Sequence, residues 1–573
     1  MNMGKITQRR NLGVIALFAT IAGILFIFGL TEPYHYDTAE YMQAVQIFKE
    51  TSELRCFPEA RCFNSYSLLP LSLLLGYMTL PVTVCLSALL TLIMYFFWIR
   101  ALTDHTTAAI STILLFTVPA SIMTITHMKE DFLVLMYMVA AMLLVSGKRP
   151  AYVRYAGGVL YALAILSKEM PIMFLPLFVT SMYVYSLRDD ARWGDFISRD
   201  SLLRGARDIT VFLLVTVATV SVFDRHHFQA LWTSTASPYV GQFKGLFSSL
   251  FPVGISSWRY GVGTFLFVAQ FIGLASVTFE TDRVKKAIYA TFILEFVLLF
   301  FFLCNLSVRV YRHFLWPSLV SLPLMVVVFR KALSFIGISQ TVRNAITWGT
   351  CILIAMFLFY SVYPVLSFHR KLNTIAEFYK DIPGERHNTL VMGMDNCIFV
   401  RYFSHLRCIS HPVDATEAQA REFANSIAAE MQNGTTVLVL PDFLSYDAHK
   451  SIVNVFTSSF PIEKVYSNWF QDYHFMDYGY TVDEYSDILL FKAKRSGRDV
   501  SRCNVVCHES TRGTIAMKNA AALDIEYHAC NMYCEGGSYR EDNIVVMHNR
   551  LFPDLKVAGV VRLQKPEMAP IPP

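Results

Sequence analysis

Eleven apolar runs occupy most of the first 370 residues of this chain, with short polar segments between them. A membrane-spanning α-helix needs about 20 predominantly apolar residues, and several of these runs are shorter than that. The pattern nevertheless predicts a polytopic α-helical membrane domain over residues 1–370. The runs lie roughly at 12–30, 82–99, 108–125, 132–146, 155–167, 170–187, 209–223, 261–279, 287–304, 314–329 and 345–364.

The composition agrees with a membrane protein. Hydrophobic residues make up 54% of the 573 residues and charged residues only 16%, whereas a soluble domain carries about 25% charged residues. The net charge of +5 is modest and is better explained by basic cytoplasmic loops than by a nucleic-acid surface. We therefore expect the lipid bilayer as a partner and no nucleic acid.

Basic residues set the expected orientation. The first run is too long for a typical signal-peptide core, and no small-residue cleavage site follows it, so we expect a retained first helix with a cytoplasmic N-terminus. Eleven spans then place the loop after residue 30, and everything after about 365, outside the cytoplasm. The apolar stretch 67–80, which Pro81 breaks from the next run, is expected to be a juxtamembrane or re-entrant helix. The loops assigned to the cytoplasm are rich in Arg and Lys, as the positive-inside rule requires: Arg100; Lys148, Arg149 and Arg154; Arg188, Arg192, Arg199, Arg204 and Arg207; Arg283, Lys285 and Lys286; Arg330, Lys331 and Arg343.

Most of the cysteines fall on the same outer side, where an oxidising compartment favours disulfides. A Cys56–Cys62 bond would close the first outer loop. A Cys397–Cys408 bond would close a loop in the C-terminal part. The last four form two C-x3-C pairs, which suggests a cross-linked helical hairpin, with a zinc site as the alternative. The eight outer cysteines are Cys56, Cys62, Cys397, Cys408, Cys503, Cys507, Cys530 and Cys534.

The pattern changes after about residue 370. Short apolar runs at 389–392, 436–440 and 487–491 predict strands, and 414–431 predicts a helix with Asp414 as its N-cap and Gly434 past its end. This order suggests a small extracytoplasmic α/β domain over 371–495. Residues 496–573 then form a Cys-rich module with a Pro-rich tail, expected to be disordered over 564–573. No phosphate-binding glycine loop is present, so no nucleotide cofactor is indicated.

Four short segments collect ionisable residues at the outer ends of the apolar runs. Such groups are costly at a bilayer boundary unless they are paired or functional. One segment surrounds Asp37, which stands between Tyr36 and Glu40. The others are 127–131, 167–171 and 309–317, and their candidate residues are Glu130, Asp131, Lys168, Arg309, Arg312 and His313.

In this order the four segments resemble motifs of the GT-C glycosyltransferases that use polyprenyl-phosphate-linked sugars, such as protein O-mannosyltransferases and lipid A aminoarabinose transferases. Asp37 in YHYDTAEYMQAV is similar to the acidic residue of their first outer loop. Asp131 in KEDFLVLMYM and Lys168 in LSKEMPIMF resemble a second acidic position and a lysine turn. The segment RVYRHFLWP looks like their arginine motif, with Arg309 or Arg312 as the arginine. Departures exist, since Asp37 has no adjacent acidic residue and the lysine turn lacks glycine.

The resemblance implies an inverting transfer of a sugar from a polyprenyl-phosphate donor to an extracytoplasmic acceptor: an envelope glycolipid, a polysaccharide or a protein hydroxyl. Asp37 would be the general base, with Tyr36 and Glu40 as accessory residues. Glu130 and Asp131 would orient the acceptor or help to bind Mg²⁺ or Mn²⁺, although the motif shows no metal geometry. The donor phosphate would meet Lys168, Arg309, Arg312 and His313. The expected location is a bacterial inner membrane, with the C-terminal domain periplasmic.

Plainer readings stay open at each position. Asp37 and Glu40 also fit a capping box, and Asp131 also fits a helix cap. Arg309 and Arg312 also fit basic side chains that snorkel from a helix end. Glu295 lies inside an apolar run, where a basic partner on another helix would explain it. At the level of the whole protein, the alternatives are a transporter or flippase of envelope components and a non-catalytic assembly protein.

Overall fold

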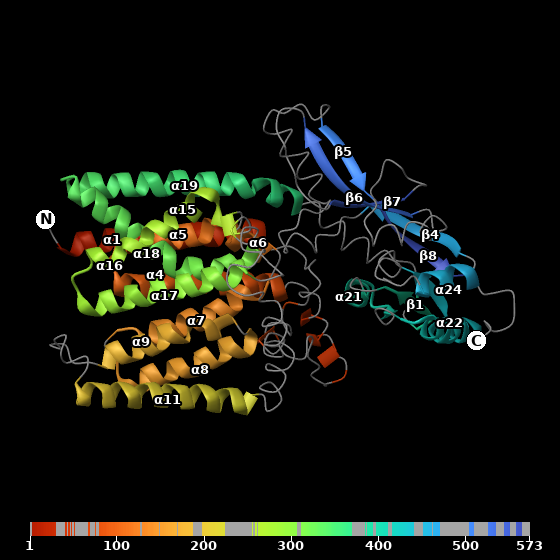
Figure 1. Cartoon of the computed structure of the whole chain (residues 1–573), viewed down its shortest axis with the longest axis horizontal. Coiled ribbons are helices and arrows are strands. Elements are labelled where there is room, and N and C mark those ends of the chain that lie inside the picture. The colour runs from red at the N-terminus through yellow and green to blue at the C-terminus, as the bar shows by residue number, and fades with distance from the viewer. Residues whose placement is uncertain are drawn as a thin grey trace. The chain divides into compact units, whose positions relative to one another are not determined.

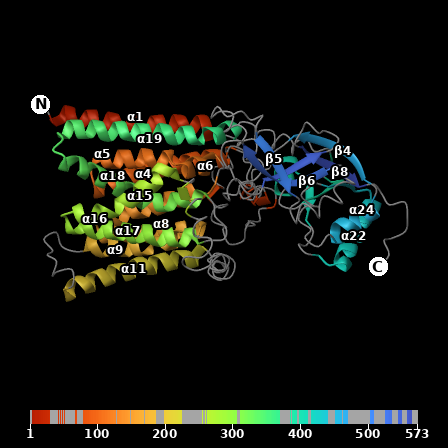
Figure 2. The same ribbon diagram turned by 45° about the horizontal axis from the view of Figure 1, so that its top comes forward.

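The computed structural model forms two compact units, and the helical unit comprises residues 1–31 and 44–363. Each of the eleven apolar runs coincides with one helix or with two or three consecutive helices. Figures 1 and 2 show these helices lying roughly parallel or antiparallel to one another. The structure describes residues 3–29, 41–42, 44–45, 47–48, 51, 67–68, 75, 79–126, 129–147, 149–168, 170–186, 198–223, 255, 258–259, 262–305, 311–369, 384–385, 387–393, 397–410, 415–439, 451–460, 462–469, 503–508, 525–534, 544–549 and 557–563.

Among the described residues, five helical segments are long and apolar enough to cross a membrane: Leu80–Leu102, Arg199–Val222, Arg283–Cys304, Arg312–Phe335 and Gln340–Tyr360. The others are shorter apolar helices, so the number of eleven spans stays a prediction. The helices are α1 (Met3–Gly29), α4 (Thr79–Leu102), α5 (His105–Thr117), α6 (Pro119–Thr126), α7 (Asp131–Val145), α8 (Ala151–Ser167), η3 (Met170–Phe174), α9 (Leu175–Ser186), α11 (Arg199–Phe223), α15 (Thr264–Ile272), η5 (Gly273–Ala275), α16 (Ser276–Phe279), α17 (Arg283–Cys304), η6 (Tyr311–Phe314), α18 (Leu315–Phe335) and α19 (Gln340–His369).

Prolines and glycines place the ends of several helices. Pro119 opens α6 and Pro81 lies in the first turn of α4, where the missing N–H costs no intrahelical hydrogen bond. The sequence analysis expected Pro81 to separate a preceding helix, but residues 69–74 lie outside the described part of the chain. Gly263 precedes α15 with φ 87°, and a Cβ there would collide with Leu358. A glycine at this position therefore permits the entry into α15.

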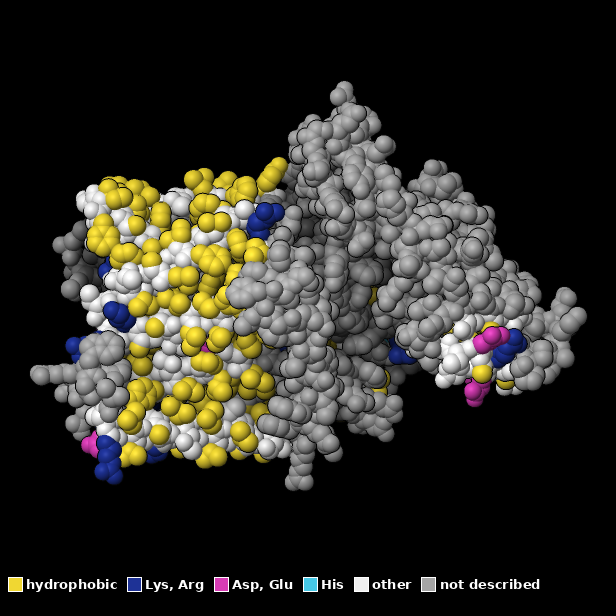
Figure 3. Space-filling model, in the orientation of Figure 1, with side chains coloured by type: hydrophobic (Ala, Val, Ile, Leu, Met, Phe, Trp, Pro, Cys, Tyr) yellow, Lys and Arg dark blue, Asp and Glu magenta, His cyan; other side chains and the backbone are white. Residues whose placement is uncertain are grey.

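One hydrophobic core runs through the helical unit, and buried hydrogen bonds connect its helices. The Tyr95 hydroxyl on α4 donates to the Leu319 carbonyl on α18 at 2.9 Å. The Trp98 indole N–H donates to the Ser146 hydroxyl after α7 at 3.1 Å. The outer faces are apolar as well, and Leu353 and Phe357 on α19 are 69% and 60% exposed. In Figure 3 hydrophobic side chains cover most of the described face of this unit, as expected of a surface in contact with lipid.

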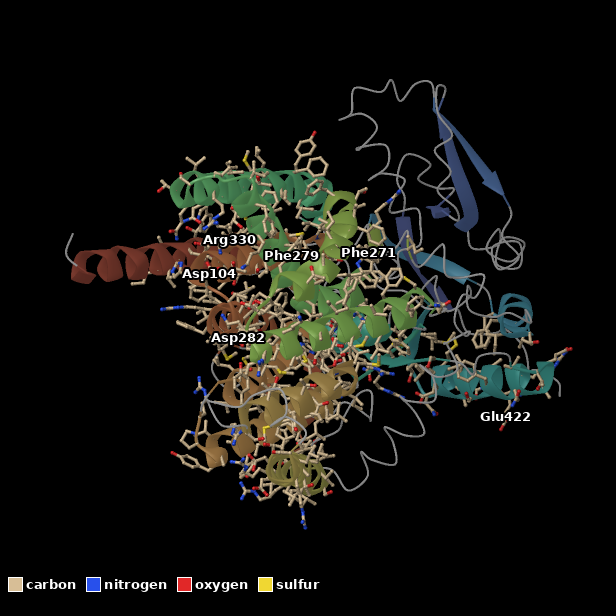
Figure 4. The ribbon with its side chains drawn as sticks, turned by 60° about the vertical axis from the view of Figure 1, so that its left-hand side comes forward. Asp104, Phe271, Phe279, Asp282, Arg330 and Glu422 are labelled. Carbon is tan, nitrogen blue, oxygen red and sulfur yellow. A yellow bond between two sulfur atoms is a disulfide. The ribbon has the colours of Figure 1, made fainter. Side chains whose placement is uncertain are left out.

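One end of the bundle is held by polar contacts between helices. The Arg330 guanidinium on α18 pairs with Asp104, the N-cap of α5, and donates to the Thr107 hydroxyl at 2.7 Å. Figure 4 shows Asp104 and Arg330 near each other. The same guanidinium lies 3.3 Å from the Asn344 side-chain oxygen on α19. These contacts join α5, α18 and α19.

The second unit contains residues 32–43 and 364–573, and its main element is a mixed five-stranded sheet in the order β2-β1-β3-β8-β4. Strands β1, β2 and β3 are parallel, whereas β8 pairs antiparallel with both β3 and β4. Residues of α22 and α24 form a hydrophobic core with β1 and β3. The elements are β1 (Thr389–Met392), α21 (Cys397–Phe399), η7 (Val400–Ser404), β2 (Arg407–Ile409), α22 (Glu417–Gln432), β3 (Thr436–Val439), α24 (Ser451–Ser459), β4 (Ile462–Trp469) and β8 (Val557–Leu563).

Strands β1 and β3 lie where the sequence predicts them, but the helix between them begins later. Its N-cap is Thr416, whose hydroxyl accepts a hydrogen bond from the Gln419 backbone N–H, while the Gln419 side-chain oxygen accepts one from the Thr416 backbone N–H. The predicted N-cap Asp414 was therefore wrong, because the capping box forms two residues further on. Gly434 follows the helix with φ 92°, as predicted. The predicted strand at 487–491 and the tail at 564–573 lie outside the described residues.

The Cys-rich segment is a sheet and not the helical hairpin that the sequence suggested. Strands β5 (Cys503–His508), β6 (Ile525–Cys534) and β7 (Ile544–Asn549) form an antiparallel sheet in that order. Residues 496–573 were predicted to form a separate module, yet β8 within this range lies between β3 and β4 in the sheet of the α/β domain. After β4 the chain forms the separate sheet β5-β6-β7, and it then returns to the first sheet through β8.

A disulfide joins Cys397 and Cys408, with their Cα atoms 5.3 Å apart, which is the pairing expected from the sequence. It connects α21 to β2. Cys56 and Cys62 lie outside the described residues. Cys85, Cys304 and Cys351 are buried and form no disulfide, in keeping with their positions in the apolar runs.

Candidate functional site

Three helix ends meet at one end of the bundle. Helix α7 begins at Asp131, and α8 returns after a connection of five residues to end beside it, so that Lys168 forms its C-cap. Turn η6, which contains Arg312 and His313, leads into α18. Because α18 continues from Leu315 to Arg330, its start lies about 22 Å along the helix from the Asp104–Arg330 pair.

A buried lysine links the two carboxylates of this end. Lys168 Nζ lies 2.8 Å from Asp131 Oδ1 and 3.2 Å from Glu130 Oε1. The three side chains are at most 2% exposed. Such a pair is stable only when its hydrogen bonds offset the loss of hydration, and here one ammonium group bonds to both carboxylates.

Asp131 also contacts α18. The Trp316 indole N–H donates to Asp131 Oδ1 at 3.2 Å, and Arg312 Nε lies 3.4 Å from Oδ2. A single carboxylate therefore joins the start of α7, the end of α8 and the start of α18. We call Lys129, Glu130, Asp131, Lys168, Arg312, His313 and Trp316 the basic cluster, since Lys129 and His313 are buried at the same helix ends, at 0% and 3% exposure.

The basic cluster carries more positive than negative charge. Lys129, Lys168 and Arg312 contribute three cations and Glu130 and Asp131 two anions. Arginine is well suited to phosphate, because its planar guanidinium binds two oxygens at once.

The structure brings together five of the residues that the sequence singled out: Glu130, Asp131, Lys168, Arg312 and His313. Asp37, Tyr36, Glu40 and Arg309 lie outside the described residues. Sequence reasoning assigned no role to Lys129 and Trp316, although both stand within the quoted motifs. It could not have found the Trp316–Asp131 bond, because 185 residues separate the two in the chain.

Glu295 has a structural partner that the sequence analysis did not anticipate. It lies on α17 and is fully buried, and its Oε1 accepts a hydrogen bond from the Leu177 backbone N–H at 3.1 Å. Leu177 is in the first turn of α9, where N–H groups lack acceptors within the helix. The carboxylate thus caps a helix N-terminus, whereas a basic side chain had been expected.

Within the described residues, no group of three or more His, Cys, Asp or Glu side chains could hold a metal ion. Glu130 and Asp131, the acidic pair considered for a divalent ion, are bonded to Lys168, and Asp131 also to Arg312 and Trp316. Positive side chains at these oxygens repel a metal ion, so this pair does not fit one.

Comparisons with known proteins relate the fold to solved structures. No protein-family model matches this chain, and no curated protein matches it in sequence. ArnT from Cupriavidus metallidurans bound to undecaprenyl phosphate is similar with a TM-score of 0.51 and 14% identity, over 79% of this chain and 96% of that one. The oligosaccharyltransferase of Archaeoglobus fulgidus in its apo form is similar with a TM-score of 0.52 and 8% identity, over 96% and 88% of the two chains. This chain therefore has the fold of the GT-C glycosyltransferases, the resemblance that its four motifs indicated.

Proposed function

We propose that this protein is an integral membrane glycosyltransferase that moves a sugar from a polyprenyl-phosphate donor to an acceptor hydroxyl outside the cytoplasm. Two enzymes with the same fold support the reaction class: one is an ArnT bound to undecaprenyl phosphate, and the other is an oligosaccharyltransferase. The acceptor is an envelope glycolipid, a polysaccharide or a protein hydroxyl. The chain would lie in a bacterial inner membrane with its N-terminus cytoplasmic and its C-terminal domain periplasmic.

The observation that carries this proposal is the basic cluster. Its cations are buried at helix ends of an apolar bundle. A polyprenyl phosphate has its anionic group directly attached to a long apolar chain, so both parts of the donor find complementary surroundings: the phosphate beside Lys168 and Arg312, and the lipid along the helices. A lipid-linked phosphate suits this site better than a water-soluble nucleotide, for which the sequence has no binding loop.

The chemistry would follow from where charge develops. The acceptor oxygen attacks the anomeric carbon opposite the phosphate, the bond from that carbon to the phosphate oxygen breaks, and its electron pair stays on the phosphate. The phosphodiester becomes a monoester, so negative charge grows beside Arg312 and Lys168. Preorganised cations at that place lower the barrier, because they need no reorganisation during the reaction. Inversion at the anomeric carbon follows from attack on the opposite face.

In this scheme Asp131 orients the cations and is not itself the base. Its two oxygens face Lys168, Trp316 and Arg312, so it is already engaged as an acceptor. Glu130 shares Lys168 with it. The proton of the acceptor hydroxyl would go to Asp37, with Tyr36 and Glu40 beside it in the sequence and Arg309 as a further phosphate ligand. That assignment rests on the sequence motif.

Binding of the donor lipid without its sugar tests the cluster directly. The purified full chain in lipid nanodiscs would be titrated with undecaprenyl phosphate and, separately, with undecaprenol, which lacks the phosphate. We expect the wild type to prefer the phosphorylated lipid. Arg312→Gln should weaken binding of undecaprenyl phosphate about tenfold or more, because a hydrogen bond to a charged group contributes about 1.5–3 kcal/mol.

Arg330→Gln is the matched control, since it removes an arginine from the other end of the same helix. It should bind undecaprenyl phosphate as the wild type does. Equal binding of the two lipids by the wild type, or equal losses in the two arginine variants, would contradict the proposal.

A further inference from the structure

A buried amide is connected to the turn that carries Arg312 and His313. Gln270 on α15 is 1% exposed, and both ends of its side chain are bonded. Its Oε1 accepts a hydrogen bond from the Trp258 indole N–H at 3.0 Å, and its Nε2 donates to the Ser318 hydroxyl at 3.1 Å. Since an indole nitrogen can only donate, this contact fixes which end of the amide faces which partner.

Both partners of Gln270 reach Phe314. The Ser318 hydroxyl donates to the Phe314 carbonyl at 2.8 Å. The Trp258 ring packs on the Phe314 ring, with centroids 5.1 Å apart. Phe314 is the last residue of η6 and follows Arg312 and His313 directly. The amide is thus connected by two routes to the turn that contains two members of the basic cluster. One route has two hydrogen bonds through Ser318, and the other has one hydrogen bond and one ring contact through Trp258.

Two further aromatic rings surround Trp258. Phe296 and Phe300 on α17 contact the same indole, with ring centroids at 5.6 and 5.2 Å. The ring is fully buried. Among apolar neighbours, hydrogen bonds are the contacts that favour one orientation over others, because a displaced polar group would lose its partner without gaining water. The network therefore fixes the position of η6 more strictly than packing alone would.

We propose that Gln270 is a positioning residue for the donor phosphate: together with Trp258 and Ser318 it holds η6 so that Arg312 and His313 face the phosphate group. This inference rests on the proposed function, since it takes the basic cluster as the phosphate site. The effect of Gln270 on binding passes through Phe314 and the turn.

Two serines of α18 offer a matched pair for the test. Ser318 and Ser321 are both buried, and each donates to the carbonyl four residues earlier. Only Ser318 also bonds to Gln270. Ser318→Ala and Ser321→Ala therefore remove the same atom from the same helix, and they differ in whether the Gln270 network is broken. Gln270→Leu and Trp258→Phe break the network from its other members while keeping most of the side-chain volume.

The measurement is the affinity of each full-length variant for undecaprenyl phosphate and for undecaprenol, at equal amounts of folded protein judged by size-exclusion chromatography. Ser318→Ala and Gln270→Leu should bind undecaprenyl phosphate about fivefold or more weakly than the wild type, with undecaprenol binding unchanged, and Trp258→Phe should act in the same direction. Ser321→Ala should bind both lipids as the wild type does. A general loss of packing would instead weaken the binding of both lipids to the same extent.

The outcomes separate this inference from the proposed function. If the wild type does not prefer the phosphorylated lipid, the proposed function fails. If the wild type prefers it but Ser318→Ala binds undecaprenyl phosphate as tightly as Ser321→Ala does, the positioning role of Gln270 is wrong and the proposed function stands. Should Gln270→Leu not fold, the comparison of the two serine variants with Trp258→Phe still decides.

Discussion

The ammonium nitrogen of Lys168 lies 2.8 Å from Oδ1 of Asp131, and neither side chain has appreciable contact with water. The two residues come from the end of α8 and the start of α7, so the ion pair closes one end of a helical hairpin. The ion pair also bears on the chemical role of Asp131. Its carboxylate already contacts the Lys168 ammonium, the Trp316 indole and the Arg312 guanidinium. We therefore expect Asp131 to hold these cations in place and another residue to act as the base.

Breaking this pair should destabilise the protein strongly. Removing one partner of a buried pair leaves an uncompensated charge and costs about 3–5 kcal/mol. Lys168→Met and Asp131→Asn should therefore each lower the free energy of unfolding by about that amount. Asp131→Asn should lower the free energy of unfolding more than Lys168→Met does, because Asp131 also contacts Arg312 and Trp316. Denaturant unfolding of the purified protein in detergent measures these values.

The double variant is the control for this prediction. Lys168→Met combined with Asp131→Asn removes both charges, so its loss of stability should be clearly smaller than the sum of the two single losses. If the single losses simply add, the two side chains do not interact and the site as described is incorrect.

The ion pair at the other end of the bundle should make stability depend on pH. Burial alone would raise the pKa of Asp104, but the Thr107 hydrogen bonds and the Arg330 charge outweigh it and hold that pKa below its usual value. A lowered pKa means that the stabilisation is present above the unfolded-state pKa of about 3.9 and is lost as the pH falls through the folded-state value. Asp104→Asn should therefore lower Tm at pH 7.

A comparison of Asp104→Asn with the wild type at low pH is the control for this prediction. Since Asn can still cap α5, the difference in Tm between Asp104→Asn and the wild type should shrink as the pH falls below about 4. Thermal unfolding in detergent at several pH values measures it. A difference that is the same at every pH would show that the charge of Asp104 contributes nothing.

The register of the Cys-rich sheet predicts a disulfide connectivity. Strand pairing sets Cys503 opposite Cys534 and Cys507 opposite Cys530. Directly opposed residues of antiparallel strands have Cβ atoms about 4.5–5.5 Å apart, and an interval of four residues keeps both pairs on one face of the sheet. We predict bonds Cys503–Cys534 and Cys507–Cys530, in addition to Cys397–Cys408.

Peptide mapping by mass spectrometry, without reduction and after blocking free thiols, reads this connectivity directly. Cys85, Cys304 and Cys351 are the internal reference, since they should be recovered as free thiols once the protein is denatured. Bonds within one strand, such as Cys503–Cys507, or zinc released on denaturation would show that the register argument is wrong.

The sequence predicted what depends on local patterns and missed what depends on the fold. Each apolar run located a helical segment of the membrane domain, because a helix in lipid must satisfy its own backbone and needs an apolar surface. The C-x3-C spacing did not distinguish a helix from a strand, because residues four apart lie on the same face of either element. The predicted helical hairpin was wrong for this reason. The capping box of α22 was visible as Thr416 and Gln419, yet Asp414 was chosen from residue type alone.

The candidate site was predicted as a set of residues but not as an arrangement. Motif order identified Asp131, Lys168 and Arg312, whereas the distances that make Asp131 an anchor depend on how α7, α8 and α18 pack. Gln270 could have been noticed as a polar residue in an apolar run. Its partners Trp258 and Ser318 could not, since only the tertiary structure brings α15 and α18 together.

The central claim is that this protein transfers a sugar from a lipid-linked phosphate, with Asp37 as the base. Mass spectrometry of envelope lipids and glycans tests it most directly, in cells that lack the gene and in cells that express the wild type, Asp37→Asn or the control Asp104→Asn at equal levels. We predict that one glycosylated species is lost, and its unglycosylated acceptor accumulates, both without the gene and with Asp37→Asn, while Asp104→Asn restores the wild-type profile. Full restoration of that species by Asp37→Asn, or profiles unaffected by the gene, would contradict the account.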